Sequence, residues 1–282
     1  MNRRSEWRSS VFRDPKKAGT IASPYFVWAL IFILVPLAMI LWYGFTDDTG
    51  AFTAANIASI LQPEHAKSLL LALELSILST VICFLLAYPL GMILAKNKVS
   101  SQGIITTIFI LPMWMNFLLR TFSWMTLLEN HGVINGILEF LHLPGIHVIN
   151  TPAAIVIGMV YNFLPFMIMP IYNSLSKIDD NVINAARDLG ANSVQTFLRV
   201  TLPLTVPGII SGVTMVFIPA LTTFAISTML GGSKILLIGN VIEQEFTLTY
   251  DWHLGSGLSI VLMVFIVINM VVSALSEKKD EQ

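Results

Sequence analysis

The sequence predicts an all-α integral membrane protein with six transmembrane helices and both termini in the cytoplasm. Of the 282 residues, 55% are hydrophobic and only 12% are charged, whereas an average soluble domain is about 25% charged. The mean hydropathy is +0.75. The net charge of −1 is not typical of a protein that binds nucleic acid. The single cysteine, Cys83, excludes an intramolecular disulfide and a Cys-rich metal site.

Each predicted span is a mostly apolar run of about 20 or more residues, the length needed to cross the hydrocarbon core. The six runs are 25–45, 68–95, 103–128, 153–175, 206–230 and 254–275. The first resembles a signal peptide but is too long, and no small-residue cleavage site follows it. We therefore expect a basic cytoplasmic tail at 1–24, a membrane domain at 25–275 and a short cytoplasmic tail at 276–282.

The orientation follows from the distribution of lysine and arginine, which are enriched in cytoplasmic loops. With the N-terminus inside, thirteen of the 16 basic residues fall on the cytoplasmic side. Lys67 and Lys234 fall outside, and Arg120 lies within a span. Both termini are therefore predicted to be cytoplasmic.

The predicted external segments carry an excess of acidic residues. These are Asp47, Asp48, Glu64, Glu129, Glu139, Glu243, Glu245 and Asp251. A negative face raises the local concentration of a cationic substrate, but exclusion of basic residues would leave acids behind in any case. The five histidines are also predicted to be external, and their spacing predicts no metal site.

Most of the predicted spans contain proline, which removes a backbone hydrogen bond and tends to kink a helix. These prolines include Pro36, Pro89, Pro112, Pro165, Pro170 and Pro219. This density favours broken helices around a pathway, as in transporters, although proline is common in membrane helices generally.

The long cytoplasmic segment 176–205 predicts two short helices. Asp179, Asp180 or Asn181 can cap the first, and Gly190 provides a left-handed stop. Asn192 or Ser193 starts the second, which we expect to end at Leu202-Pro203. The result is a helix–turn–helix knob that suits a groove of another protein, although a helix lying on the bilayer surface is an alternative.

The same segment resembles the EAA loop of permease subunits of bacterial ABC importers. The family pattern is E-A-A, three residues, G, nine residues, I, one residue and L-P. It is matched by Asn184-Ala185-Ala186, Gly190, Val200 and Leu202-Pro203, with Asn184 replacing the family's glutamate. The resemblance implies a type I ABC-importer permease fold. It also implies that this loop docks in a cleft of an ATP-binding subunit, through Asn184, Ala185, Ala186, Arg187, Asp188, Gly190, Arg199, Leu202 and Pro203.

Further stretches are similar to the spermidine/putrescine permeases within that family. They are 111–121, 164–172, 185–191, 231–232 and 236–242. This resemblance implies two ATP-binding subunits, a second permease subunit, and an external or periplasmic polyamine-binding protein in a bacterial inner membrane. Because the chain has no G-x-x-x-x-G-K-[ST] phosphate loop, we expect no cofactor in this chain and no enzymatic activity. ATP would then be hydrolysed by a partner.

The alternatives are an ABC permease for another small solute or ion, or a self-contained secondary transporter. The secondary transporter is weakly supported, since the spans contain one clear acid and no evident internal repeat. An intramembrane enzyme is weaker still, because no paired-histidine or G-x-S-x-G motif is present.

A pathway for polyamines needs carboxylates or carbonyl groups for the ammonium groups and aromatic faces for cation–π contacts. The candidates are Glu74, Trp124, Tyr161, Asn162, Asp251 and Trp252. Glu74 and Arg120 are the charged residues within spans, and both should face the interior. Their similar depth also permits an ion pair, with Arg120 in a structural role. The aromatic residues and Asp251 could equally be packing or interfacial anchors.

Overall fold

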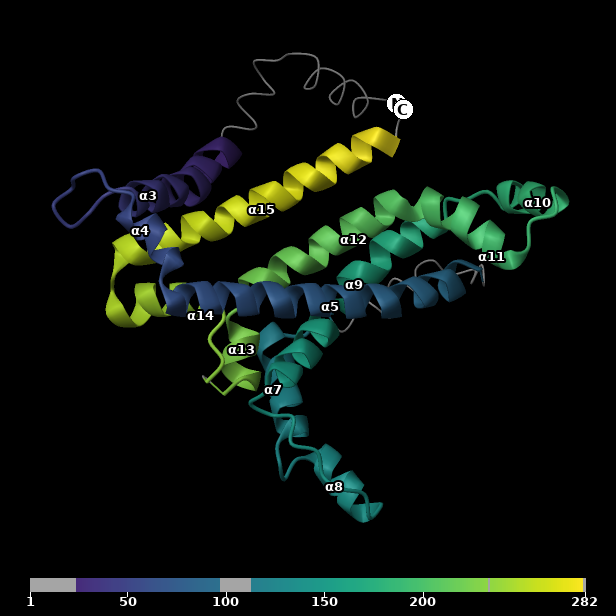
Figure 1. The fold of residues 1–282 in the computed structure, drawn as a ribbon, viewed down its shortest axis with the longest axis horizontal. Coiled ribbons are helices and arrows are strands. Elements are labelled where there is room, and N and C mark those ends of the chain that lie inside the picture. The colour runs from purple at the N-terminus through teal and green to yellow at the C-terminus, as the bar shows by residue number, and fades with distance from the viewer. Residues whose placement is uncertain (1–23, 97–112, 233, 281–282) are drawn as a thin grey trace, which may run out of the picture.

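A computed structural model describes residues 24–96, 113–232 and 234–280, and this part of the chain is helical apart from turns and one isolated bridge between Thr46 and Phe52 (Figure 1). The α-helices are α3 (Val35–Gly44), α4 (Ala55–Ala58), α5 (Pro63–Lys96), α7 (Phe117–Leu128), α8 (Val133–Phe140), α9 (Pro152–Leu175), α10 (Asp180–Asp188), α11 (Ser193–Thr196), α12 (Leu202–Thr222), α13 (Ala225–Leu230), α14 (Ile238–Gln244) and α15 (Trp252–Asp280). Short 3₁₀ or π segments lie at Leu30–Leu34, Ser59–Leu61, Phe197–Thr201 and Glu245–Thr249. The all-α prediction is confirmed for the described residues.

Five helices of the described part are long and apolar enough to cross a membrane. They are Pro24–Gly44, Pro63–Lys96, Pro152–Leu175, Ser193–Thr222 and Trp252–Leu275. The predicted span 103–128 lies partly outside the described residues. In its described part the helix begins only at Phe117, because the Asn116 side chain caps it by accepting hydrogen bonds from the N–H groups of Leu118 and Leu119.

The core is built from α5, α9 and α12, which pack together along their lengths. Small residues allow α12 to approach α9 closely. A Cβ at Gly208 would lie 2.7 Å from the Pro170 carbonyl oxygen, and one at Gly212 would lie 3.3 Å from that of Met167. Close packing through small residues is common in membranes, because the hydrophobic effect does not drive helices together in lipid and van der Waals contact must do so.

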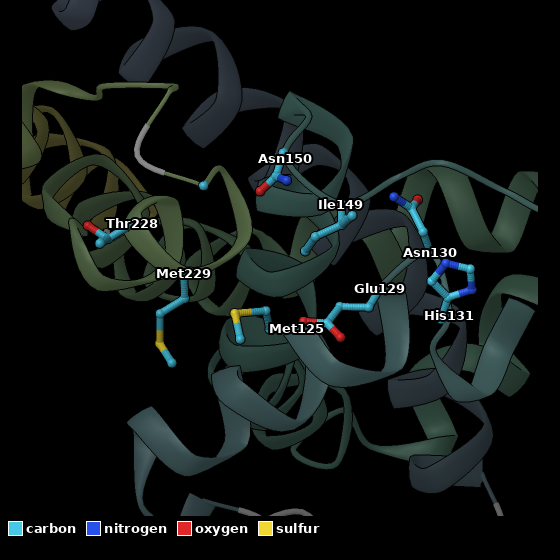
Figure 2. A pocket seen from close by; sticks show the side chains of 9 residues that line it. Met125, Glu129, Asn130, His131, Ile149, Asn150, Thr228 and Met229 are labelled. Carbon is cyan, nitrogen blue, oxygen red and sulfur yellow. The ribbon is translucent and has the colours of Figure 1, made fainter.

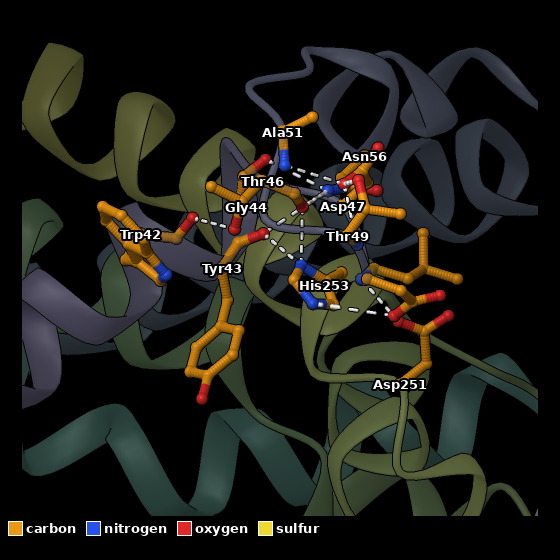
Figure 3. A network of polar contacts seen from close by, with 12 residues as sticks. Trp42, Tyr43, Gly44, Thr46, Asp47, Thr49, Ala51, Asn56, Asp251 and His253 are labelled. Atoms are coloured by element: carbon orange, nitrogen blue, oxygen red, sulfur yellow. Dashed lines mark hydrogen bonds and ion pairs between the residues drawn. The ribbon is translucent and has the colours of Figure 1, made fainter.

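Helix α3 packs against α15, and its apolar side chains are otherwise exposed. A polar network ties the C-terminal end of α3 to the start of α15 (Figure 3). His253 Nδ1 lies 3.0 Å from the Tyr43 carbonyl oxygen and 2.5 Å from that of Thr46. Since both partners are acceptors, Nδ1 carries the proton and donates. Asn56 donates to the Thr46 oxygen at 2.9 Å. These hydrogen bonds hold the C-terminal end of α3 against the start of α15.

The turn that follows α3 is organised by Asp47. Its carboxylate accepts hydrogen bonds from the Thr49 hydroxyl at 2.6 Å and from the amides of Thr49 and Ala51 at 2.9 Å. The Thr49 hydroxyl chiefly, and then the Ala51 amide, lower the pKa of Asp47 below its usual value. The turn is therefore held by the ionised carboxylate.

The predicted span 206–230 is wrong as a single helix. Helix α12 ends at Thr222, Thr223 is extended (φ −67°, ψ 138°), and a separate helix α13 follows. The break is held by Asn240 of α14, whose side chain donates to the Phe224 carbonyl oxygen at 3.1 Å. This tertiary contact adds to the helical hydrogen bond that the Phe224 oxygen accepts from the Thr228 amide.

A proline inside a helix does not by itself break the helix in this protein. Pro89 lies inside α5, and Pro165 and Pro170 lie inside α9, yet both helices are continuous. Pro219 also lies inside α12, one turn before its end. The expectation that proline density would break the spans is therefore wrong for α5 and α9.

Candidate functional sites

The first candidate site is the predicted knob, which projects beyond the ends of α9 and α12 (Figure 1). Asp179 caps α10 by accepting a hydrogen bond from the Asn181 N–H at 2.9 Å. At the other end Gly190 has φ 86°. Its amide donates to the Arg187 oxygen at 2.8 Å, and the Ala191 amide donates to the Ala186 oxygen at 3.1 Å. This is a Schellman stop, so the first predicted helix is confirmed with both of its ends.

The second helix of the knob begins as predicted but does not end as predicted. Asn192 and Gln195 form a capping box, with hydrogen bonds of 3.0 and 2.9 Å. The helix then continues from Ser193 to Thr222, so the expected end at Leu202-Pro203 is wrong. Pro203 lies in the first turn of α12, directly after the π-helical segment Phe197–Thr201. A π-helical turn accommodates a proline, which has no N–H to donate to the helical hydrogen-bond ladder.

Most of the predicted docking residues are on the surface of the knob. Asn184, Ala185, Arg187, Asp188, Gly190, Arg199 and Pro203 are exposed, whereas Ala186 and Leu202 are half-buried. Leu189 is 89% exposed and Val194 is 64% exposed. Two exposed aliphatic side chains beside Arg187 and Arg199 give the knob a mixed apolar and basic surface.

Tyr88 of α5 anchors the base of the knob and was not predicted from the sequence. Its hydroxyl lies 2.8 Å from the Thr205 hydroxyl of α12. Its ring meets Phe197 edge-on, with centroids 5.7 Å apart. Both contacts join residues more than a hundred positions apart, and no local sequence pattern marks them.

The second candidate site is a polar and aromatic cluster between α7 and α9. Arg120 is 7% exposed, and its Cζ lies 6.0 Å from the centroid of the Tyr161 ring. Trp124 meets the same ring edge-on at 5.1 Å. Asn162 is fully buried and donates to the Gly158 oxygen at 2.8 Å and to the Thr121 hydroxyl at 3.4 Å. The structure thus brings Arg120, Trp124 and Tyr161 together, and Asn162 joins the same two helices through Thr121.

Other predicted pathway residues lie apart from this cluster. Glu74 is exposed on α5, so the structure places Arg120 against Tyr161 rather than in a shared buried site with Glu74. Asp251 caps α15 by accepting from the Leu254 N–H at 2.8 Å. Trp252 packs against Tyr43 and Phe246, with ring centroids 6.1 and 5.6 Å away. Both residues therefore have anchoring contacts.

A third candidate site is a cavity of 570 Å³ that the sequence reading missed (Figure 2). It lies between the C-terminal end of α7, the loop after it, the segment before α9, and α13. Its lining residues are Met125, Glu129, Asn130, His131, Ile149, Asn150, Thr228, Met229 and Gly232. The sequence signals were Glu129 among the external acids and the Gly231-Gly232 pair, but nothing in the sequence joins them. Among the described residues there is no group of three or more His, Cys, Asp or Glu side chains that could hold a metal ion.

Comparison with known proteins shows the family of the chain. Residues 87–278 match the family described as "Binding-protein-dependent transport system inner membrane component". The chain is 38% identical to the spermidine/putrescine transport system permease protein PotB of Escherichia coli K12, over 90% of this chain and 97% of that protein. It is also 38% identical to the PotB protein of Haemophilus influenzae, over 85% of this chain and 86% of that protein.

Its fold is shared with a chain of a bacterial alginate ABC transporter that was solved in complex with an alginate-bound periplasmic protein. The TM-score is 0.75 at 17% identity, over 94% of each chain. The fold, the exposed knob and the match over most of the length together show that the chain belongs to the family of inner-membrane components of binding-protein-dependent transport systems.

Proposed function

We propose that the chain is the membrane-spanning permease subunit of an ATP-driven importer of spermidine or putrescine, and that it forms half of the translocation pathway. The observation that carries the proposal is the 38% identity to PotB permeases over nearly the full length of both proteins. In this arrangement six spans cross the bacterial inner membrane, with both termini and the knob in the cytoplasm. The basic residues of the tails and the knob support that orientation.

The knob couples the permease to an ATP-binding subunit. The exposed side chains of Leu189 and Val194 fill apolar positions in a cleft of that subunit. Arg187 and Arg199 add charge contacts. Movement of the knob passes to the membrane part along the continuous helix Ser193–Thr222 and through Tyr88, which joins α5 to α12. A rigid connection of this kind suits alternating access, in which one half rocks against the other.

The partners are two ATP-binding subunits, a second permease subunit and an external polyamine-binding protein. The exposed apolar surface of α3 supports contact with lipid or with the second permease. The chain itself binds no cofactor in this proposal, and ATP is bound and hydrolysed by the partners.

Within the membrane, the α7–α9 cluster forms part of the pathway wall. The guanidinium of Arg120 occupies one face of Tyr161 and repels ammonium groups from that face. Passage is therefore expected on the Trp124 side of the cluster. Glu74, Asp251 and Trp252 remain candidates at other positions of the route.

The test is uptake by the complete importer reconstituted in proteoliposomes with ATP inside. Labelled spermidine and putrescine are expected to accumulate only when the binding protein is present outside. A version lacking residues 184–190 should lose both ATPase co-purification and uptake. ATP-dependent uptake of another solute, with no uptake of either polyamine, would refute the substrate assignment and retain the permease assignment.

A further inference from the structure

The cavity beside α7 and α13 has the chemistry of a binding site for an aliphatic ammonium ion. Its volume of 570 Å³ falls within the range of about 300–1,000 Å³ that is usual for small-molecule sites. Glu129 is the one carboxylate among its nine lining residues, and none of the nine is lysine or arginine. The lining thus favours a cation.

The backbone of Glu129 is held firmly in place. Its amide donates to the Met125 oxygen at 3.1 Å, and its oxygen accepts from the Gly132 amide at 2.8 Å. The buried Asn135 donates to the same oxygen at 3.1 Å and also binds both backbone groups of Ile146. A Cβ at Gly132 would lie 2.9 Å from the Glu129 oxygen, so the tight turn requires glycine. A fixed backbone presents the carboxylate in a limited set of positions.

The opposite wall of the cavity is also held in place by backbone and side-chain contacts. Gly232 (φ 63°) and Asn150 (φ 62°) both have left-handed backbones, and a Cβ at Gly232 would collide with the Asn150 side chain. The Asn150 amide donates to the Leu230 oxygen at 2.9 Å, which attaches this wall to the end of α13. The cavity is therefore formed by packed segments on both sides.

The side chains inside it suit a molecule that has both charge and methylene groups. In Figure 2 the Glu129 carboxylate extends toward Met125, and Met229 lies across the cavity on α13. Thioether side chains are flexible and apolar and adapt to an alkyl chain. Asn130 and Asn150 also line the cavity, and the Asn130 side-chain oxygen lies 2.8 Å from His147 Nδ1. A carboxylate with apolar walls would bind one ammonium group and the adjoining methylene groups.

We propose that this cavity is an entry site for the polyamine, with Glu129 as the counter-ion of one ammonium group and Met125 and Met229 as contacts for the alkyl chain. The proposal deepens the proposed function and rests on it for the substrate class and for the external position of the cavity. It assigns a specific role to one of the eight predicted external acids.

The first test compares Glu129→Gln with Glu139→Gln in the reconstituted importer. Glu139 lies exposed on α8 and does not line the cavity, so its substitution removes the same charge from the same predicted side. Glu129→Gln is expected to raise the KM for spermidine about three- to tenfold, Glu129→Asp to raise it less, and Glu139→Gln to leave it unchanged. Equal effects of the two glutamine variants, or no effect of Glu129→Gln, would overturn the site.

The second test measures occupancy without transport. Cys83 is buried, so a cysteine placed at Met229 can be labelled selectively by a polar maleimide in the assembled importer. Spermidine is expected to slow labelling of Met229→Cys, and this protection should disappear in Met229→Cys/Glu129→Gln. Absence of protection in Met229→Cys refutes the site even if Glu129→Gln fails to assemble, and protection that persists in the double variant refutes the role of Glu129. If spermidine still slows labelling of Met229→Cys but the importer transports no polyamine, the proposed function is refuted instead.

Discussion

Substitution of Asn240 is expected to loosen α13 and the helix break before it. Asn240 is 2% exposed. Its oxygen accepts from the Ser227 hydroxyl at 2.5 Å and the Leu237 amide at 3.1 Å. Its nitrogen donates to the Phe224 oxygen at 3.1 Å and the Thr228 hydroxyl at 2.8 Å. Three of these four hydrogen bonds join α14 to α13 and its N-cap Phe224, and the fourth, from the Leu237 amide, closes the start of α14.

The loss of free energy expected in Asn240→Ala depends on which of these groups keep another hydrogen-bond partner. In Asn240→Ala the Ser227 hydroxyl can still donate to the Phe224 oxygen, and the Phe224 oxygen keeps its helical partner, the Thr228 amide. The Leu237 amide loses the acceptor that the Asn240 side chain supplied. A buried unsatisfied group costs about 1–3 kcal/mol, and an ordinary hydrogen bond contributes about 1 kcal/mol net. We expect the local free energy of opening of α13 to fall by about 2–3 kcal/mol.

Hydrogen exchange of the α13 amides in nanodiscs measures this free energy directly. A loss of about 2 kcal/mol corresponds to exchange about 30-fold faster, while α5 and α9 should keep their protection. Ser227→Ala removes one of the four bonds and should give a clearly smaller effect, and the double variant should be less than additive because the residues are in contact. Unchanged protection of α13 in Asn240→Ala, or an equal loss in Ser227→Ala, would contradict the reasoning.

Three further predictions concern packing, pH and coupling. Gly208→Ala should destabilise the protein, because its Cβ would lie 2.7 Å from a backbone oxygen of α9, whereas the matched change Gly136→Ala on α8 meets nothing within 4 Å and should be neutral or stabilising in a thermal unfolding assay. Because the pKa of Asp47 is lowered in the folded protein, the ionised carboxylate stabilises its turn fully above the unfolded pKa of about 3.9, and this contribution is lost as the pH falls through the lower folded pKa. The free energy of opening measured by hydrogen exchange of the Ala51 amide should therefore be constant between pH 7 and 5 and should fall only in strong acid. Leu189→Ser on the knob, at a side chain that is 89% exposed, should leave the permease folded yet reduce co-purification of the ATP-binding subunit several-fold, and retention at the wild-type level would argue against docking through this surface.

The positions of most apolar helices could be predicted from local sequence because hydropathy acts residue by residue. The knob could also be predicted, since caps such as Asp179 and Asn192 and the left-handed Gly190 are local signals. Its second helix was misjudged at Pro203. Proline is compatible with a first turn, and the preceding π-helical segment carries the chain through it.

The candidate sites were predicted less completely, because their residues meet across distant parts of the chain. Arg120 and Tyr161 were each identified by residue type, but their contact depends on how α7 packs on α9. Tyr88 and Asn240 were missed altogether, since a tyrosine or asparagine in an apolar stretch has no pattern that reveals its partner.

Composition and short-range patterns were therefore sufficient for the membrane class, the apolar helices and the exposed knob, because transfer into lipid and helix capping depend on neighbouring residues alone. The break between α12 and α13 and the cavity around Glu129 required the folded arrangement. In each, a backbone oxygen at a helix end accepts a further hydrogen bond from a side chain of another helix, the Phe224 oxygen from Asn240 and the Glu129 oxygen from Asn135. Such pairings exist only after the helices have packed.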